Sequence, residues 1–265
     1  MTAARLFVLT ATGTDAAVVL RRGPSSQVAS LLWTRGDDTF EMGQWLNARI
    51  YEHRSDVSPD GRHMIYFANK GATVGGYSVV SRAPWFRAQV YLPQGTTWHG
   101  GGGFTSSGEV FMNGSTLPSD LPDGLQPAPD NAFPHSTDGF HMGDLFAALM
   151  VRRGWRRSEA GGYDVRLWRD LENGGSIEMR VVQGRKDRGL VSLAYAFLAP
   201  DGKWYDWPDW TWAERWKDGI HFASEGALWF ARPDSDGRLT DKRCIRDFNV
   251  MAFEALPAPY EGVVS

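Results

Sequence analysis

The sequence predicts an all-β protein assembled from repeated sheet units, and three observations favour this class. The 265-residue chain contains 12 Trp, 30 Gly and 14 Pro, a composition typical of stacked sheets in which large flat side chains alternate with tight turns. Short runs of β-forming residues recur along the chain, each closed by Gly, Pro, Ser or Asp. Turns that end in glycine return at nearly regular intervals.

The N-terminal part of the chain predicts four strands in close succession. Their residues are mostly aliphatic or aromatic, and a turn residue follows each run. The predicted strands are Leu6 to Thr10, Ala16 to Arg21, Val28 to Thr34 and Thr39 to Trp45.

The most informative segment is Ser58-Pro59-Asp60-Gly61, which leads into the strand His63 to Ala68. Proline presets the turn, and Asp-Gly closes it before a run of β-formers. This arrangement resembles the repeat of bacterial β-propellers of the TolB and WD40-like kind, in which such a turn joins two strands of one blade. The resemblance implies a propeller-like ring of sheets. The sequence departs from the family pattern in one respect, because no predicted strand ends in the Trp-Asp pair that is typical of such blades.

Weaker copies of this turn occur at Ser106-Ser107-Gly108 and Ala199-Pro200-Asp201-Gly202. Their glycines and Gly61 are separated by 47 and 94 residues, so the second interval is twice the first. A period in the range of ~40 to 50 residues is that of a four-stranded propeller blade. The chain length divided by this period predicts five to six sheet units. A β-sandwich is the main alternative, and ring closure would bring Arg5 to Thr10 against strands from the C-terminal third.

One irregular segment interrupts the strands. The stretch Asn113 to Phe140 is rich in Pro, Gly, Ser and Asp and has no apolar period, which predicts a long loop. Directly after it, Gly143 to Arg153 predicts a short helix with an acidic first turn and a basic last turn.

Strands resume in the C-terminal half, where the most aromatic segment is Trp204 to Trp216. The other predicted strands are Tyr163 to Arg169, Ser176 to Gln183, Val191 to Leu198, Ala227 to Ala231 and Cys244 to Phe253. We therefore expect a single domain over residues 1–265, with one short helix inserted in it.

Charge and cysteine content restrict the expected environment and partners. With 28 basic and 31 acidic residues, the chain has no overall positive field to attract nucleic acid or anionic lipid. Cys244 is alone, no signal-peptide pattern is recognised at the N-terminus, and no apolar run is long enough to span a bilayer. We expect a cytoplasmic bacterial protein that needs no cofactor.

Two groups of residues are candidates for ligand or metal binding. The run Gly100 to Gly103 exposes amide groups that could cradle an anion, although a crowded strand explains four glycines equally well. His99, His135 and His141, with Asp138 and Asp144 near in sequence, could hold zinc, but their spacing matches no zinc signature.

Two further groups could carry acid–base chemistry. Glu52, Arg54 and Asp56 would share one face of a strand and form either an ion network or a pair of catalytic carboxylates. The tryptophans of Trp204 to Trp216 stand beside Asp206, Asp209 and Glu214, as in sugar-binding clefts and also in packed cores. The sequence contains no Gly-x-Ser-x-Gly elbow.

These observations favour a non-catalytic module that binds a protein or peptide partner. The predicted binding residues are Phe133, His135, Phe140 and His141, because they lie on the long loop. Catalysis stays open: one alternative is a glycoside- or ester-cleaving hydrolase that uses Glu52, Asp56 and Asp206 at the mouth of a central channel. The other alternative is an immunity or inhibitor protein for a toxin, which the sequence does not distinguish from the binding module.

Overall fold

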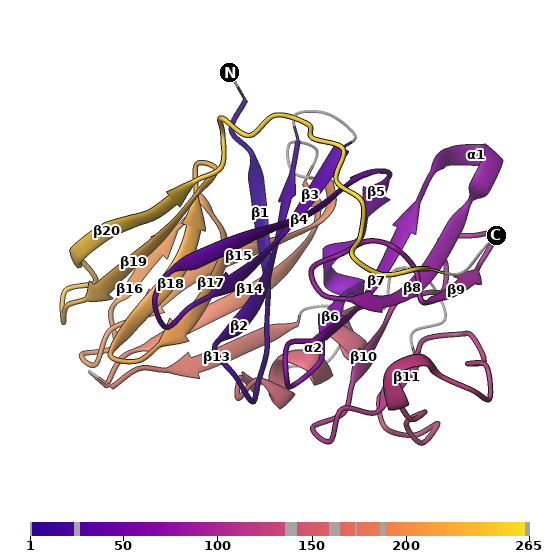
Figure 1. Ribbon diagram of the computed structural model, residues 1–265. Helices are drawn as coiled ribbons and strands as arrows, with labels where there is room; N and C mark the ends of the chain where they lie inside the picture. The colour runs from indigo at the N-terminus through magenta and orange to yellow at the C-terminus, as the bar shows by residue number, and fades with distance from the viewer. Residues whose placement is uncertain are drawn as a thin grey trace. The chain divides into compact units, whose positions relative to one another are not determined.

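The structure of the chain is a computed structural model that describes residues 2–23, 27–135, 142–158, 165–172, 174–185 and 189–262. The chain divides into two compact units (Figure 1). Unit 1 contains Met1–Phe7 and Gly154–Met251, and unit 2 contains Val8–Arg153 and Ala252–Ser265.

The first sheet of unit 2 is a meander in the order β1-β2-β3-β4. Its strands are β1 (Arg5–Thr10), β2 (Ala16–Arg22), β3 (Gln27–Thr34) and β4 (Thr39–Asn47). The unit boundary falls inside β1. Both faces of β2 are buried, which explains its run of consecutive aliphatic residues rather than an alternating pattern. All four strands were predicted to within two residues at each end.

The second sheet of unit 2 has the order β5-β7-β8-β9, with β6 also paired to β7. Its strands are β5 (Arg49–Ile50), β6 (Asp56–Val57), β7 (His63–Asn69), β8 (Gly76–Arg82) and β9 (Val90–Pro93). A 3-10 turn, η1 (Glu52–Arg54), separates β5 from β6, and a single helical turn, α1 (Gly71–Val74), separates β7 from β8. Beside this sheet lies a two-stranded sheet of β10 (Gly102–Phe104) and β11 (Val110–Met112).

Helix α2 (Met142–Arg152) confirms the predicted short helix. Its buried side chains Leu145 and Leu149 form a core cluster with Phe111 of β11 and Phe133 of the long loop. The described part of that loop contains one 3-10 turn, η2 (Pro122–Gly124), and a parallel bridge between Val110 and Pro127. The loop is therefore folded back on β11 along part of its length.

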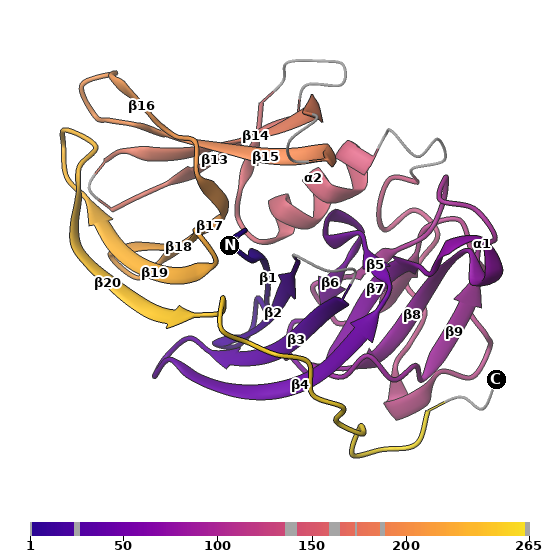
Figure 2. The same ribbon diagram turned by 90° about the horizontal axis from the view of Figure 1, so that it is seen from above.

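Unit 1 consists of two antiparallel meanders (Figure 2). The first contains β12 (Arg156–Arg157), β13 (Arg166–Asp170), β14 (Ser176–Arg185), β15 (Gly189–Leu198) and β16 (Trp204–Trp207). The second contains β17 (Trp210–Trp216), β18 (Gly219–Ser224), β19 (Ala227–Pro233) and β20 (Leu239–Asp247). The last predicted strand, Cys244 to Phe253, was placed too far along the chain, because β20 begins at Leu239 and the chain leaves the sheet after Asp247.

Stacked aromatic rings fill the core of unit 1. The ring of Trp210 lies between those of Trp207 and Phe222, at centroid distances of 4.0 and 4.1 Å. Phe197 of β15 extends the stack from Trp207 at 5.6 Å. Within the segment Trp204–Trp216, these tryptophans thus serve as core side chains, which bury large area at small entropic cost.

The described residues form four sheets of four or five strands and one two-stranded sheet. Three of the four larger sheets are meanders of consecutive strands as in a propeller blade, and in the fourth both β5 and β6 pair with β7. The all-β class and the propeller-like sheets are confirmed, but the predicted number of five to six units is wrong.

The glycine turns explain why the number of units was predicted wrongly. Each of the three glycine N–H groups bonds to the carbonyl three residues earlier, yet Gly61 links β6 to β7, Gly108 closes the two-stranded sheet and Gly202 links β15 to β16. The three turns therefore share the same hydrogen bond but join strands at different positions in their sheets, so their spacing does not count sheets.

The N-terminal residues contact C-terminal strands within unit 1. The Thr211 hydroxyl donates to the Leu6 carbonyl at 2.9 Å, and the Ala4 N–H donates to Asn249 Oδ1 at 2.9 Å. The backbone of β1 pairs with β2 instead, so the expected contact between chain ends is made partly through side chains. Among the described residues, no helix is long and apolar enough to cross a membrane. The single domain and the compartment stay predictions.

Candidate functional site

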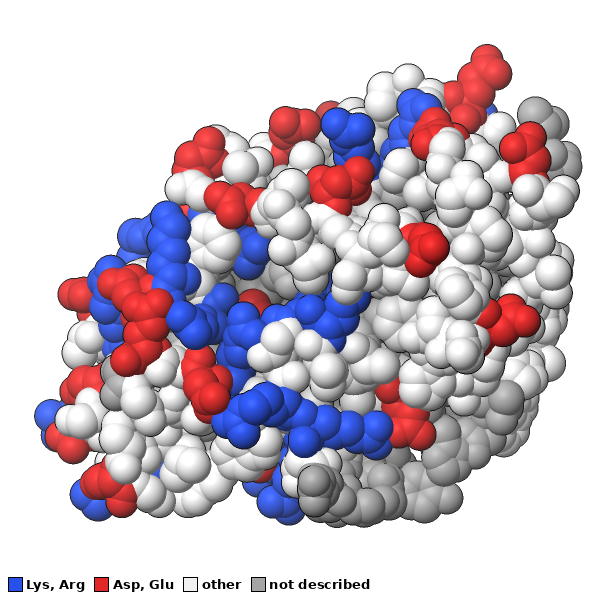
Figure 3. Space-filling view, turned by 90° about the horizontal axis from the view of Figure 1, so that it is seen from below, with Lys and Arg blue, Asp and Glu red and all other residues white. Residues whose placement is uncertain are grey.

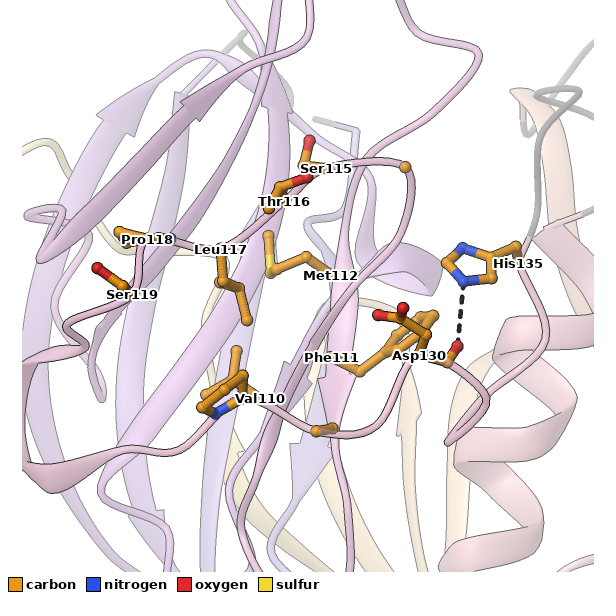
Figure 4. A pocket seen from close by; sticks show the side chains of 13 residues that line it. Val110, Phe111, Met112, Ser115, Thr116, Leu117, Pro118, Ser119, Asp130 and His135 are labelled. Atoms are coloured by element: carbon orange, nitrogen blue, oxygen red, sulfur yellow. Dashed lines mark hydrogen bonds between the residues drawn. The ribbon is translucent and has the colours of Figure 1, made fainter.

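A pocket of about 610 Å³ opens in unit 2 at the long loop (Figure 4). Its volume lies within the range of ~300 to 1,000 Å³ common for ligand sites. The lining combines apolar side chains from β11 and the loop with hydroxyl groups, one carboxylate and one imidazole. The lining residues are Val110, Phe111, Met112, Gly114, Ser115, Thr116, Leu117, Pro118, Ser119, Pro127, Ala128, Asp130 and His135.

The core beneath β11 positions the pocket. Val110 and Met112 belong to a cluster of buried residues that includes Leu121 of the loop, whereas Phe111 packs in the cluster around α2. A hydrogen bond from Gln94 to the Ser115 hydroxyl ties the loop to the residue that follows β9. The loop is thus fixed on both sides of the pocket, which favours a preformed site over one that must be ordered on binding.

Two of the four predicted partner-binding residues, Phe133 and His135, contact the Phe111 ring. The His135 ring lies 5.0 Å from the Phe111 ring at the edge of the pocket, and its Nε2 is 3.1 Å from the Asp130 carbonyl oxygen. Phe133 packs against Phe111 at 5.3 Å and is only 8% exposed, so it is a core residue next to a lining residue and does not itself line the pocket. Phe140 and His141 lie outside the described residues.

The glycine run serves close packing. A Cβ on Gly100 would overlap the Phe67 ring, one on Gly101 would overlap the Arg54 backbone, and one on Gly102 would overlap the Phe111 carbonyl oxygen. The structure therefore provides the crowded strand that was the alternative to an anion cradle.

Arg54 is buried where the glycine run meets η1. Its guanidinium lies 5.5 Å from the Tyr51 ring centre and 5.1 Å from that of Phe67. Nη1 donates to the carbonyls of Thr97 and His99 at 2.8 and 2.9 Å. Burial lowers the pKa of Arg54 to about 10, so the group stays protonated at neutral pH. It holds the chain segment before β10 to the second sheet of unit 2.

The predicted carboxylates have separate arginine partners. Glu52 forms an ion pair with Arg22 of β2. Burial opposes its charged form, but Arg22 prevails, and the pKa of Glu52 lies below its usual value. Asp56, in contrast, pairs with Arg152 and Arg153 at the end of α2. Neither carboxylate lines the described pocket.

Asp56 is the centre of a buried charge cluster and is 0% exposed. Its Oδ1 accepts from Arg152 Nη2 at 2.9 Å and from Arg153, and its Oδ2 accepts the Phe104 N–H at 2.8 Å. Arg152 also donates to the Phe104 carbonyl at 2.5 Å. This cluster joins β6, β10 and α2, so it is a structural network of the kind proposed as the alternative to catalysis.

A second polar cluster in unit 2 was not predicted. Asp123 adopts a left-handed backbone conformation in η2 (φ 57°), which directs its carboxylate to three partners. Arg82 donates to both oxygens at 2.5 and 2.6 Å, Gln89 donates at 2.8 Å, and His63 Nε2 lies 3.0 Å away. The hydrogen bonds from Arg82 keep the pKa of Asp123 well below its usual value. The Asp123-Gly124 pair in the loop was the only sequence signal.

Unit 1 contains the third predicted carboxylate, Asp206, which is exposed and receives a hydrogen bond from Arg180 at 2.9 Å. The neighbouring acid on this face of the sheet is Glu178, whose side chain is 3% exposed. Burial raises the pKa of Glu178 against the influence of Arg180 and Arg166. Trp204 is 51% exposed on the same sheet. Because Asp206 belongs to unit 1, whereas Glu52 and Asp56 belong to unit 2, the three candidate catalytic acids do not form one cluster within either unit.

The remaining candidates are distributed over both units. Glu214 is buried and accepts the Trp155 Nε1–H at 2.8 Å, Asp209 is exposed, and Cys244 is an exposed thiol. His99 Nδ1 is buried without a hydrogen bond. Within the described ranges, no three His, Cys, Asp or Glu side chains gather as a metal site would require.

Charged side chains are unevenly spread despite the net charge of −3. Figure 3 shows Lys and Arg gathered in one area of the face seen from below, with Asp and Glu around it. Many arginines of unit 1 are paired with carboxylates, among them Arg156 with Asp170 at 2.6 Å and Arg215 with Glu172 at 2.7 Å. These pairs reduce the positive charge that the arginines of unit 1 present to solvent.

Comparison with known proteins gives no family. No family model matches the chain, and no curated protein matches it. Among solved structures, the crystal structure of an uncharacterized protein from Listeria monocytogenes EGD-e is similar over 94% of this chain and 84% of that chain, at 9% identity and a TM-score of 0.31. A similarity at this level supports no conclusion about function.

Proposed function

We propose that this protein is a non-catalytic binding module that holds a segment of a protein partner in the pocket at the long loop. The observation that carries the proposal is the pocket itself, a preformed concavity with both apolar and polar side chains in its lining. Exposed lining residues such as Thr116, Pro118 and Ser119 leave it open to a large partner.

The chemistry of the lining supports a peptide ligand. Leu117, Pro118 and Pro127 offer apolar contacts to a side chain. The hydroxyls of Thr116 and Ser119 can bond to backbone amides. The best-placed carboxylates outside the pocket are already neutralised by arginines, which favours a structural role for them over acid–base catalysis.

The test is selection of peptides from a random display library against the intact chain, followed by affinity measurement with the enriched peptide. Thr116→Trp would fill the pocket with an indole and should weaken binding by about tenfold or more. Ser106→Trp is the matched control, because Ser106 is equally exposed on the β10–β11 turn but outside the lining. Melting curves of both variants check that they are folded.

Two results would contradict the proposal. One is a selection that enriches no peptide over an unrelated immobilised protein. The other is an enriched peptide that binds Thr116→Trp as tightly as the unchanged chain, since the pocket would then not be its site.

A further inference from the structure

The hydrogen-bonding pattern of β11 leaves one of its edges open. Gly103 of β10 pairs with Phe111 of β11. At the next pair, neither N–H bonds to the partner strand: the Phe104 N–H donates to Asp56, and the Val110 N–H donates to the Gln126 carbonyl at 2.8 Å. Because bonding direction alternates along an antiparallel strand, the N–H and C=O of Met112 point away from β10 like those of Val110.

At Val110 this outer edge is occupied by the chain itself. The Val110 carbonyl accepts the Ala128 N–H at 2.8 Å, so Gln126–Ala128 runs parallel to β11 with Pro127 opposite Val110. Beyond Ala128 the chain turns away, with a hydrogen bond from the Ala132 N–H to the Pro129 carbonyl. The short added strand therefore stops one step before Met112.

Met112 has no backbone hydrogen bond on that edge within the described part of the chain. The residue is only 4% exposed and lines the pocket. Buried backbone donors and acceptors are almost always paired, because an unpaired group loses its hydration without compensation. A bound backbone that supplied both bonds would remove this deficit.

We infer that the partner segment binds in extended form as a strand parallel to β11, pairs its backbone with Met112 and places a basic side chain at Asp130. This inference rests on the proposed function and adds the binding mode and the chemistry of the ligand. The mode is strand addition, in which backbone hydrogen bonds provide affinity and side-chain pockets provide specificity.

Charge complementarity selects the basic side chain. Asp130 is the only acidic residue among the described residues of the lining. Its carboxylate makes no hydrogen bond or ion pair among the described residues, although its carbonyl contacts His135. It is exposed and lies two residues after Ala128, where the added strand ends. A Lys or Arg in the ligand would pair with it at the pocket edge.

The first test observes the protein. Amide hydrogen exchange by NMR, with the peptide enriched in the selection above as the probe, should slow at Met112 by about tenfold or more on binding. Phe111 is the internal control, since its N–H is already paired with Gly103. Unchanged exchange at Met112 in a saturated complex would overturn the strand pairing while leaving peptide binding intact.

The second test observes the peptide. Single N-methyl groups placed along it should weaken binding about tenfold at the one position that donates to the Met112 carbonyl, and much less at both neighbours. Equal effects at all positions would overturn the extended pairing.

The third test addresses the basic side chain of the ligand. Asp130→Asn should weaken binding and reduce its salt dependence, whereas Asp120→Asn, which changes an exposed acid outside the lining, should do neither. Equal effects of the two variants would overturn the basic contact. Absence of any enriched peptide would instead contradict the proposed function.

Discussion

A buried carboxylate between two arginines shows how one residue can connect distant parts of the chain. Asp56 bonds to residues 96 and 97 positions later in the sequence. Fixing such contacts costs desolvation of all the charges, and their mutual attraction repays it only while the set is complete. The intact cluster therefore adds little to the free energy of unfolding, but removal of one partner leaves a buried charge without compensation and destabilises the fold.

Replacement of Asp56 by Asn should destabilise unit 2 by about 3 to 5 kcal/mol, because two buried guanidinium groups lose their counter-charge. Urea unfolding measures the effect. Asp120→Asn removes an exposed carboxylate and should change stability by less than about 0.5 kcal/mol. A similarly small loss for Asp56→Asn would show that Arg152 and Arg153 find other compensation.

Asp123 predicts a specific pH dependence. Its pKa in the folded chain lies below the ordinary value of 3.8, chiefly through Arg82. Its contribution to stability is therefore complete above that value and is lost as the pH falls toward the folded pKa. Unfolding measured from about pH 7 to about pH 2 should show a difference between the unchanged chain and Asp123→Asn that shrinks in acid. A difference that stays constant below about pH 4 would contradict this account.

At the scale of single elements, β10 contains a glycine that is required by close packing and not by its backbone conformation. Gly102 is not in the left-handed region, but a Cβ there would overlap the Phe111 carbonyl oxygen of its partner strand. Gly108 in the following turn has the opposite character, with φ at 90° and open space around it.

Gly102→Ala should therefore cost about 3 kcal/mol through displacement of β11. Gly108→Ala should cost about 1 kcal/mol through backbone strain alone. Thermal and urea unfolding of the two variants compare these costs. Equal losses would indicate that β10 and β11 can separate slightly without penalty.

Elements with a local cause were predictable from sequence. The strands β1 to β4 and helix α2 follow from apolar patterning and turn residues, and their bounds were nearly correct. The number of sheets was not predictable, because a glycine turn has the same hydrogen bond wherever it occurs. The pocket was predicted only as a loop, since the pairing of Pro127 with Val110 depends on tertiary contacts. The partners of Asp56 and Asp123 were missed for the same reason.

At the scale of the whole molecule, the two units differ in how their cores are built. Eight of the 12 tryptophans, from Trp155 to Trp229, belong to unit 1, and four aromatic rings stack continuously there. Unit 2 instead combines aliphatic and aromatic core side chains with the buried charges at Asp56. Each unit has its own apolar core, which is the usual requirement for separate cooperative behaviour.

Core truncations should therefore act locally. Leu228→Ala in β19 and Val80→Ala in β8 each remove methyl groups from fully buried side chains, at a cost of about 2 to 4 kcal/mol. Amide exchange should accelerate mainly in the unit that carries the substitution. Equal acceleration in both units would show that the chain unfolds as one cooperative body.

The position of Arg54 above the Tyr51 and Phe67 rings has a spectroscopic consequence. Protons over an aromatic face experience ring-current shielding, so the guanidinium signals should appear upfield of those of exposed arginines. Bonds to the Thr97 and His99 carbonyls should also slow rotation about the Nη bonds and separate the resonances. The NMR signals of the Arg54 guanidinium thus report whether the segment before β10 remains bound to the second sheet of unit 2.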